Sequence, residues 1–363
     1  MSSTNTKHNS RATELKEPLN QDTAEKVPGT LYIPPPEENS AVRQSTIKLF
    51  AGSTSDEIVQ EISDYLNNVG YLHIKPGEYT KAEFANENIF IRLQESVRGQ
   101  DVYLVQTMCP PNLHKNIFEM LIMVDALKRD SAKRINLIFP YMAYARSDKK
   151  DQPRVPITAR MLANMIETAG ADRYMTIDLH SGQIQGFFDI PGDALHAFHL
   201  LSDHVADMNI PNLVVAATDL GFAKSARDWA EKLNTETNYI EKRRVGNEGS
   251  SSALALVGNV EGRNVLLVDD EVLTAGSVVN AVNLLRERGA QDIYLAFTHG
   301  LLAGDAVERL ARCNFKRIVL TNTIPVPLEK RLPNMDVLSI APLLAEVIRR
   351  AHEGRSVGEL FNE

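Results

Sequence analysis

The sequence predicts an α/β protein with two parallel sheets in tandem, and three observations support this fold class. Short β-branched runs alternate along the chain with amphipathic helical patterns, as in parallel sheets whose crossover helices cover both faces. Ten such runs are more than a single sheet of this kind usually contains. The length of 363 residues also exceeds the roughly 150 residues of a typical domain.

The predicted elements follow one another in a regular order from residue 47 onward. The strands of the first half are 47–51, 89–94, 102–106, 135–139 and 174–178. Those of the second half are 213–217, 264–268, 293–297, 317–321 and 335–340. Apolar residues at helical spacing predict helices over 118–126, 161–166, 223–233, 278–285, 306–311 and 343–348.

The gap near 192–212 marks the boundary between the two halves. We therefore expect an N-terminal domain over 47–196 and a C-terminal domain over 197–363, with the last helix packing back on the first domain. Residues 1–46 are rich in Ser, Thr, Asn, Glu and Pro. Such a segment buries too little apolar surface to offset the entropy lost on ordering, so we interpret it as a disordered tail.

Charge and composition restrict the class of function. The chain has 39 Lys and Arg against 47 Asp and Glu, a formal charge of -8. This balance argues against nonspecific nucleic-acid binding, which needs a broad basic face, but a local basic pocket can still bind a small anion. No apolar run approaches the roughly 20 residues of a membrane span. Two cysteines, Cys109 and Cys313, are too few for a disulfide framework, so we expect the reducing cytoplasm.

The most informative segment is 265–277, where a buried strand runs into Asp269 and Asp270 and then into a turn that opens a helix. Small residues in the turn let backbone N–H groups approach a phosphate, and the helix N-terminus adds partial positive charge. The two acids accept hydrogen bonds from sugar hydroxyls or bind Mg²⁺. This combination predicts a sugar phosphate with free hydroxyls as ligand, whereas a simple helix cap needs one acid only. The turn residues are Thr274, Ala275, Gly276 and Ser277, and we expect a positive φ at Gly276.

This segment resembles the 5-phosphoribosyl-diphosphate (PRPP) loop of type I phosphoribosyltransferases and of PRPP synthetases. Residues 175–191, MTIDLHSGQIQGFFDIP, closely resemble the signature of the PRPP synthetase family. Further similar segments are 96–99, 140–151, 154–159, 298–300, 321–325 and 345–350. The resemblance runs from about 47 to 363 and includes an N-terminal half that ordinary phosphoribosyltransferases lack. It implies two tandem domains of type I phosphoribosyltransferase-like architecture.

The resemblance also implies a reaction. The family transfers the β,γ-diphosphate of ATP to ribose 5-phosphate with the help of Mg²⁺ and releases AMP. ATP and ribose 5-phosphate are therefore the expected partners. Because the family forms dimers and hexamers, we expect a homo-oligomer.

Residue roles are implied in the same way. The catalytic residues are His180, Lys242 and Arg244, of which the last two are expected on a mobile loop that closes over the β-phosphate. The ATP-binding residues are Phe84, Asn86, Asn88, Arg146, Ser147 and Asp151. The ribose phosphate contacts Asp219, Asp269, Asp270, Thr274, Ala275, Gly276 and Ser277, and Mg²⁺ contacts His180 and Asp219. We interpret His196, His199 and His204 as one polar helix face.

Three positions depart from the family pattern. Leu273 and Asn88 stand where the family usually has Asp and Glu, and Ser147 replaces a usual Gln. Two alternatives therefore stay open: a non-catalytic homologue that regulates an active synthetase, and a phosphoribosyltransferase. Activity is favoured by the joint retention of His180, Lys242, Arg244, Asp269 and Asp270.

Overall fold

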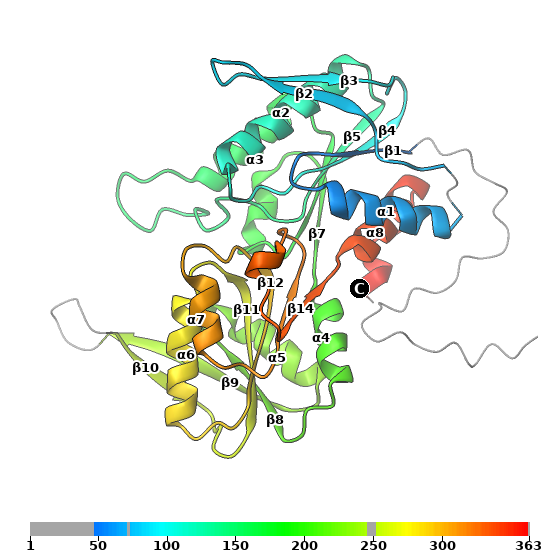
Figure 1. Cartoon of the computed structure of the whole chain (residues 1–363). Helices are drawn as coiled ribbons and strands as arrows, with labels where there is room; N and C mark the ends of the chain where they lie inside the picture. Colours follow the sequence, from blue (N-terminus) through cyan, green and yellow to red (C-terminus); the bar gives the residue numbers. More distant parts are fainter. Residues whose placement is uncertain (1–46, 71–72, 245–251, 362–363) are drawn as a thin grey trace, which may run out of the picture.

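The computed structural model describes residues 47–70, 73–244 and 252–361 (Figure 1). The tail predicted over 1–46 and most of the loop predicted after Arg244 lie outside the described residues. Within the described part, no helix combines the length and the apolar character that a membrane crossing requires.

The first sheet has five strands, all parallel, and uses the first half of the chain. Its order is β1 (Ile47–Ala51), β4 (Asp101–Val105), β5 (Arg134–Phe139), β6 (Arg173–Ile177) and β7 (Gly192–Leu195). Near-continuous apolar runs such as Leu137–Phe139 form these strands because both faces are covered. One face packs on α2 (Leu113–Arg129) and α3 (Thr158–Ala169), and the other on α1 (Asp56–Asn68) and the C-terminal α8 (Ala341–Glu353).

The second sheet has seven strands in the order β10-β9-β8-β11-β12-β13-β14, and only the β9–β10 pair is antiparallel. The bounds are β8 (Leu213–Ala217), β9 (Glu236–Arg244), β10 (Ser252–Val257), β11 (Asn264–Val272), β12 (Ile293–Gly300), β13 (Ile318–Thr321) and β14 (Met335–Leu338). Its helices are α4 (Phe198–Asp207), α5 (Ala223–Lys232), α6 (Gly276–Glu287) and α7 (Ala306–Arg312). The fold class predicted from the sequence is therefore confirmed.

Several elements differ from the sequence-based prediction. The strand predicted over 89–94 is not in a parallel sheet: β3 (Ile89–Leu93) pairs antiparallel with β2 (Tyr79–Glu83) in a separate hairpin. Its alternating exposure explains this, because a strand with one solvated face does not belong inside a covered sheet. The prediction missed β2 and β7, which are polar or short, and α1. Short 3₁₀ turns complete the chain at Gly182–Phe187, Leu220–Phe222, Leu328–Lys330 and Gly358–Phe361.

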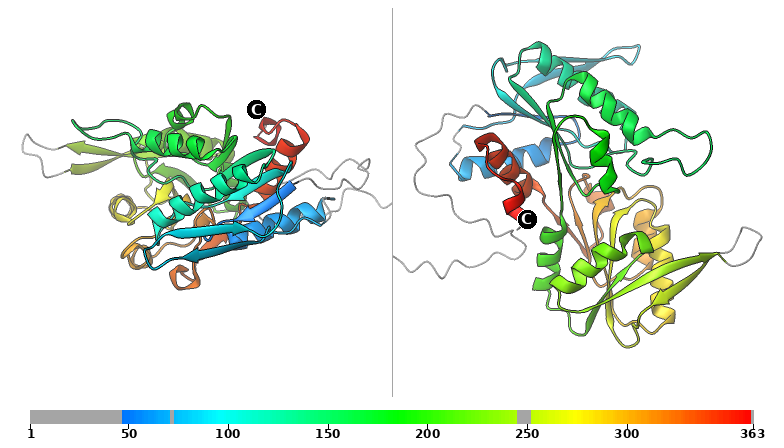
Figure 2. Two further views of the ribbon diagram at one scale, coloured as in Figure 1. Left: turned by 90° about the horizontal axis from the view of Figure 1, so that it is seen from above. Right: turned by 180° about the vertical axis from the view of Figure 1, so that it is seen from behind.

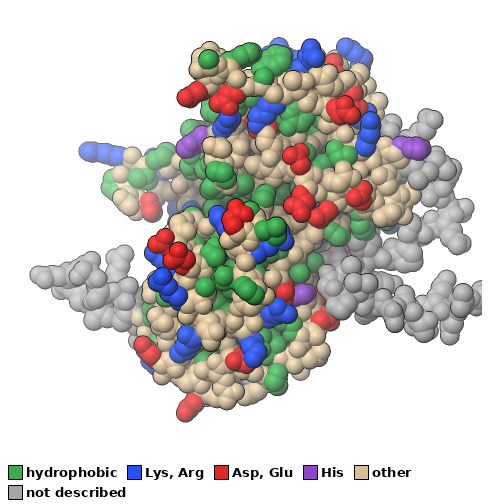
Figure 3. Space-filling view, viewed as in Figure 1, with side chains coloured by type: hydrophobic (Ala, Val, Ile, Leu, Met, Phe, Trp, Pro, Cys, Tyr) green, Lys and Arg blue, Asp and Glu red, His purple; other side chains and the backbone are tan. Residues whose placement is uncertain are grey.

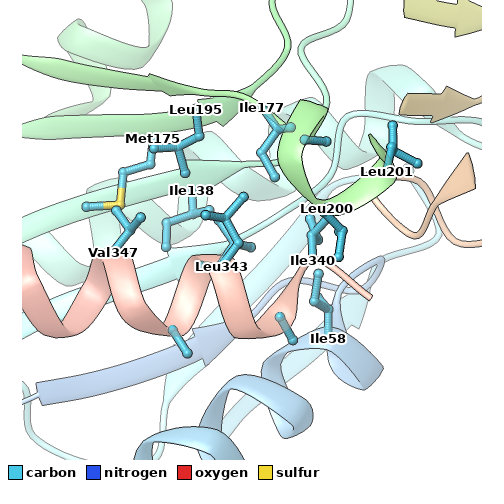
Figure 4. Packing of buried hydrophobic residues seen from close by; sticks show 14 of the residues in the cluster. Ile58, Ile138, Met175, Ile177, Leu195, Leu200, Leu201, Ile340, Leu343 and Val347 are labelled. Carbon is cyan, nitrogen blue, oxygen red and sulfur yellow. The ribbon is translucent and has the colours of Figure 1, made fainter. Parts of the chain in front are cut away.

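One apolar core joins the two halves. Side chains of the first sheet, including Ile138 and Met175, pack against Leu343 and Val347 of α8 (Figure 4). The same cluster continues through α4 and α5 to Leu266 and Val268 of the second sheet. Seen from behind, α8 lies beside α1 although the two helices come from opposite ends of the chain (Figure 2). The C-terminal helix thus covers the sheet built by the N-terminal half.

We expect Leu344→Ala to destabilise the protein by about 2–5 kcal/mol, because Leu344 of α8 is fully buried and its truncation leaves a cavity. Denaturant unfolding followed by circular dichroism measures the change. Leu328→Ala is the matched control, since Leu328 is 80% exposed and should cost less than about 0.5 kcal/mol. Equal losses in the two variants would contradict the role given to α8.

Candidate active site

The site lies where the connections of the second sheet diverge. From β8 the chain passes through α5 to β9 on one side, and from β11 it passes through α6 to β12 on the other side. Helix α5 packs in the cluster that contains Trp229, and α6 packs in a different cluster that contains Val282, so the two helices cover opposite faces. Such a switch point opens a crevice beyond the carboxyl ends of the strands, where α/β proteins bind ligands.

Strand β11 is longer than predicted and carries both acids inside it. It pairs with β8 only as far as Val268 and then continues alongside β12 to Val272. Asp269 and Asp270 therefore lie where β11 separates from β8. Asp219 lies two residues after the end of β8 and accepts a hydrogen bond from the N–H of Phe222 (3.2 Å), so it also caps the short 3₁₀ turn.

Two adjoining cavities open at this crevice. The larger, about 730 Å³, is lined by the acids, by the turn before α6 and by residues of the first half, namely Arg146, Asp148, Lys149, His180, Ser181 and Gln183. The second, about 530 Å³, shares His180, Asp269 and Asp270 and extends towards α4 and α5. The structure thus brings together His180, Arg146, Asp219, Asp269, Asp270 and Thr274–Ser277, as the sequence predicted.

The turn before α6 has the expected small residues but a different backbone. Ala275, not Gly276, adopts the left-handed conformation, with φ of 59°. Gly276 is the first residue of α6, and a Cβ there would lie 3.8 Å from Oγ1 of Thr274, an ordinary contact. The expectation of a positive φ at Gly276 was therefore wrong. The lack of a Cβ at Gly276 leaves the helix N-terminus open towards the cavity instead.

The His180 ring couples the two sheets electrostatically. It follows β6 of the first sheet, and its Nδ1 lies 2.7 Å from Oδ2 of Asp270 on β11. The hydrogen bond to Asp270 raises the pKa of His180 above its ordinary value of 6.5. Burial alone would raise the pKa of Asp270, but the hydrogen bond and charge of His180 hold it below the ordinary value. Burial and the charge of Asp270 raise the pKa of Asp269 well above its ordinary value.

Arg146 forms a second link between the sheets. Its Nε lies 2.6 Å from Oε1 of Glu271, a buried carboxylate next to the acid pair on β11. Sequence reasoning missed Glu271, although its place directly after Asp270 in a buried strand was a usable signal. Ser147, one of the predicted ATP residues, uses its backbone N–H and C=O in local bonds to Tyr144 and Ala159. Ser147 and the exposed Asp151 are not among the residues that line the two cavities.

The predicted adenine segment is not brought to the cavity within one chain. Phe84, Asn86 and Asn88 form the turn between β2 and β3, at the top of the view in Figure 1. Phe84 is 55% exposed, and on the face drawn in Figure 3 hydrophobic side chains are exposed in this upper region. The N–H of Asn88 donates to Oδ1 of Asn86 (3.3 Å), so the two Asn residues stabilise the turn itself.

Lys242 and Arg244 lie in β9 rather than in a loop. The register pairs Lys242 with Leu254 and Arg244 with Ser252, and the ribbon projects from the lower body in Figure 1. The sequence analysis missed this strand, which begins at Glu236 and contains the strand-favouring Tyr239 and Ile240. The side chains of Lys242 and Arg244, and the stretch 245–251 that we predicted to be mobile, are outside the described part of the chain.

The histidines near α4 do not form one helix face. His196 precedes the helix and lies 2.9 Å from Oδ1 of Asp178, whereas His204 in the last turn lies 3.2 Å from Asp336. Each has a carboxylate partner that was too distant in sequence to be recognised. His199 lines the smaller cavity.

The predicted Mg²⁺ ligands are compatible with a shared metal but do not surround one. His180 and Asp219 both line the larger cavity. In the described residues, no three His, Cys, Asp or Glu side chains are grouped so that they could hold a metal ion. Mg²⁺ usually binds through one or two carboxylates together with water and substrate phosphates, so this sparse set fits an ion that arrives with a nucleotide.

Comparisons with known proteins agree with this geometry. Residues 47–170 match the model of the N-terminal domain of ribose phosphate pyrophosphokinase, and residues 246–362 match the phosphoribosyl synthetase-associated domain. The first match includes α2, α3 and the segment that carries Arg146.

Similar proteins span almost the whole chain. A ribose-phosphate pyrophosphokinase of Rhodopirellula baltica is 43% identical over 319 residues, which are 87% of this chain and 99% of that protein. The Bacillus subtilis protein of the same name is 41% identical over 316 residues, 87% of this chain and 97% of that protein. The crystal structure of phosphoribosylpyrophosphate synthetase from Mycobacterium smegmatis superimposes with a TM-score of 0.79 at 42% identity, covering 85% of this chain and 99% of that one. The chain therefore belongs to the ribose-phosphate pyrophosphokinase (PRPP synthetase) family.

Proposed function

We propose that this chain transfers the β,γ-diphosphate of ATP to the O1 hydroxyl of ribose 5-phosphate, giving PRPP and AMP, at the larger cavity. One observation carries the proposal: a small-residue turn at a helix N-terminus, an acid pair and a histidine from the other sheet line the same cavity. Residues 197–363 then form the ribose-phosphate side and residues 47–196 the ATP side.

The ribose-phosphate side follows from hydrogen-bonding capacity. Thr274 to Ser277 offer backbone N–H and hydroxyl donors at the start of α6, which suit the 5-phosphate. Asp269 and Asp270 cannot bind a phosphate, but carboxyl oxygens accept hydrogen bonds from ribose hydroxyls. One oxygen of each accepts a neighbouring backbone N–H, from Asp270 (3.0 Å) and Glu271 (2.9 Å), which holds the two side chains in place.

The ATP side must neutralise charge while the diphosphate moves. The O1–Pβ bond forms as the bond between Pβ and the bridging oxygen of AMP breaks, so catalysis consists mainly of positioning and charge stabilisation. The hydrogen bond to Asp270 raises the pKa of His180 and so favours the charged form of its ring next to the β-phosphate, and Arg146 contributes positive charge there as well. Mg²⁺, when bound with the nucleotide, would add charge neutralisation near His180 and Asp219. Lys242 and Arg244 add further positive charge at the diphosphate.

The Phe84 turn supplies the adenine site of a second copy of the chain in a homo-oligomer. Its exposed aromatic ring lines neither cavity, which supports an adenine site shared with a neighbouring subunit. Cys109 and Cys313 are free and buried, which supports a reducing compartment, the cytoplasm.

We expect His180→Ala to lower kcat about a hundredfold, because losing one preorganised contact to the reacting phosphate costs on the order of 3 kcal/mol. Formation of AMP and PRPP from ATP, ribose 5-phosphate and Mg²⁺ measures the change. His204→Ala, which removes a histidine–aspartate pair outside the cavities, serves as control and should retain full turnover. If the wild-type chain is inactive in this assay but alters the activity of an added synthetase, the regulatory alternative replaces the proposal.

We expect Leu273→Asp to raise kcat/KM for ribose 5-phosphate roughly tenfold, since a hydrogen bond to a charged group contributes about 1.5–3 kcal/mol. Leu273 lines the cavity and is 36% exposed, so the new carboxylate stays hydrated and the melting temperature should not change. Leu273→Asn is the uncharged control of the same shape and should gain less. A lower melting temperature together with lower activity would mean that the cavity wall depends on the leucine.

We expect Phe84→Ala and Lys242→Ala to be poorly active alone and to regain activity when mixed. In a mixed oligomer some sites combine an intact Phe84 turn from one chain with an intact Lys242 from another. For two subunits per site, random mixing should restore up to about a quarter of the sites (by the binomial distribution of independent chains). Activity that stays at the sum of the separate variants would place both residues in the same chain's site.

A further inference from the structure

Asp178 occupies a strained position just before His180. Strand β6 ends at Ile177, and Asp178 has a φ of 40°, in the left-handed region that a residue with a Cβ rarely adopts. Such a conformation is strained and persists only where neighbouring contacts hold it. The direction in which the chain leaves β6, and hence the place of the His180 ring, depends on those contacts.

The polar groups of Asp178 are held from two directions. Its N–H donates to the carbonyl of Leu195 (2.9 Å), and its Oδ2 accepts the N–H of Ala197 (3.2 Å), both after or at the end of β7. From β12 of the second sheet, the Thr298 hydroxyl donates to Oδ2 (2.6 Å) and Nε2 of His299 lies 3.0 Å from the Asp178 carbonyl oxygen. The second pair of contacts joins the two sheets.

The ring of His299 is fixed in one orientation. A carbonyl oxygen can only accept, so Nε2 carries the proton that reaches Asp178. Nδ1 lies 2.9 Å from Oγ1 of Thr323, and the ring edge meets Tyr141 at a centroid distance of 5.0 Å. His299 is 2% exposed, so water cannot replace these partners. A rigid donor from the second sheet therefore meets the backbone carbonyl two residues before His180.

We propose that His299 is a positioning residue that acts through Asp178: its Nε2–H, supported by the Thr298 hydroxyl, holds the turn that aims His180 at the transferred phosphate. His180 is then fixed at both ends on the second sheet, by β12 through Asp178 and by β11 through Asp270. The inference rests on the proposed function of His180. Misplacing a reacting group by about 1 Å through a distant substitution can cost on the order of a hundredfold in rate, which sets the expected scale.

The test compares His299→Leu, which removes the donor, with His299→Gln, whose side-chain amide can donate from a similar place. We expect His299→Leu to lower kcat by roughly 30- to 100-fold, which is the scale expected for a misplaced reacting group. KM for both substrates should stay within about threefold of the wild-type value. His299→Gln should recover most of kcat. In a His180→Ala background, His299→Leu should have almost no further effect, because the group that it positions is gone.

Three results would overturn the inference. A full additional loss from His299→Leu in the His180→Ala background would show a role independent of His180. An equal loss in His299→Gln would show that the side-chain donor is not what matters. A rise of KM in proportion to the loss of kcat/KM would show an effect on substrate binding rather than on the position of His180. If His299→Leu does not fold, Thr298→Val takes its place in the same cycle, with Thr298→Ser as the variant that keeps the hydroxyl.

A crystal structure of His299→Leu separates failure of this inference from failure of the proposed function. If the wild-type chain makes no PRPP, the kinetic arm has no signal, but the inference still requires that the 2.7 Å contact between His180 and Asp270 is lost in the variant. An unchanged contact and an unchanged φ at Asp178 would refute the inference whatever the reaction is.

Discussion

The site depends on how the carboxyl ends of two parallel sheets are held against each other. The loops at the end of each sheet carry only part of the polar side chains of the site. A buried polar layer joins them: Thr298 and His299 contact Asp178, and Thr107 donates to the carbonyl of Thr323 (3.0 Å). Unpaired, such buried groups cost more than their bonds contribute, so the layer tolerates only one alignment of the sheets. The apolar core that runs from α8 to β11 holds the two sheets together, whereas this polar layer fixes how the sheets are aligned.

His180 and Arg146, two basic side chains of the cavity, already have carboxylate partners on the same strand. His180 pairs with Asp270 and Arg146 with Glu271, so β11 holds one basic side chain from the first sheet at each of two neighbouring positions. Under the proposed function, these pairs favour the positive charge that polyphosphate needs, but they also compete with it. On that proposal, substrate binding is an exchange in which phosphate oxygens share His180 and Arg146 with fixed carboxylates, rather than the filling of an empty basic pocket.

The three departures from the family pattern lie in different surroundings. Leu273 borders the cavity and is partly exposed, so its change alters a ligand contact and not the core. Ser147 keeps the backbone bonds that hold its turn, and Asn88 belongs to a turn closed by its own polar groups. All three are compatible with the same fold.

The sequence by itself determined the fold class, most strands and helices, and the phosphate-type turn, because period and turn chemistry are local properties of neighbouring residues. It also singled out Asp269 and Asp270 as candidates, since they follow a recognisable strand, and His180 through the resemblance of its segment to the family signature. Only the tertiary structure decided that β2–β3 is a separate hairpin, that Lys242 and Arg244 extend β9, that Asp178 and Glu271 line the cavities, and that His299 contacts Asp178. Those roles arise from pairs such as Asp178 with His299 and Arg146 with Glu271, which are more than a hundred residues apart. No local pattern encodes such a contact, because packing of the two sheets creates it.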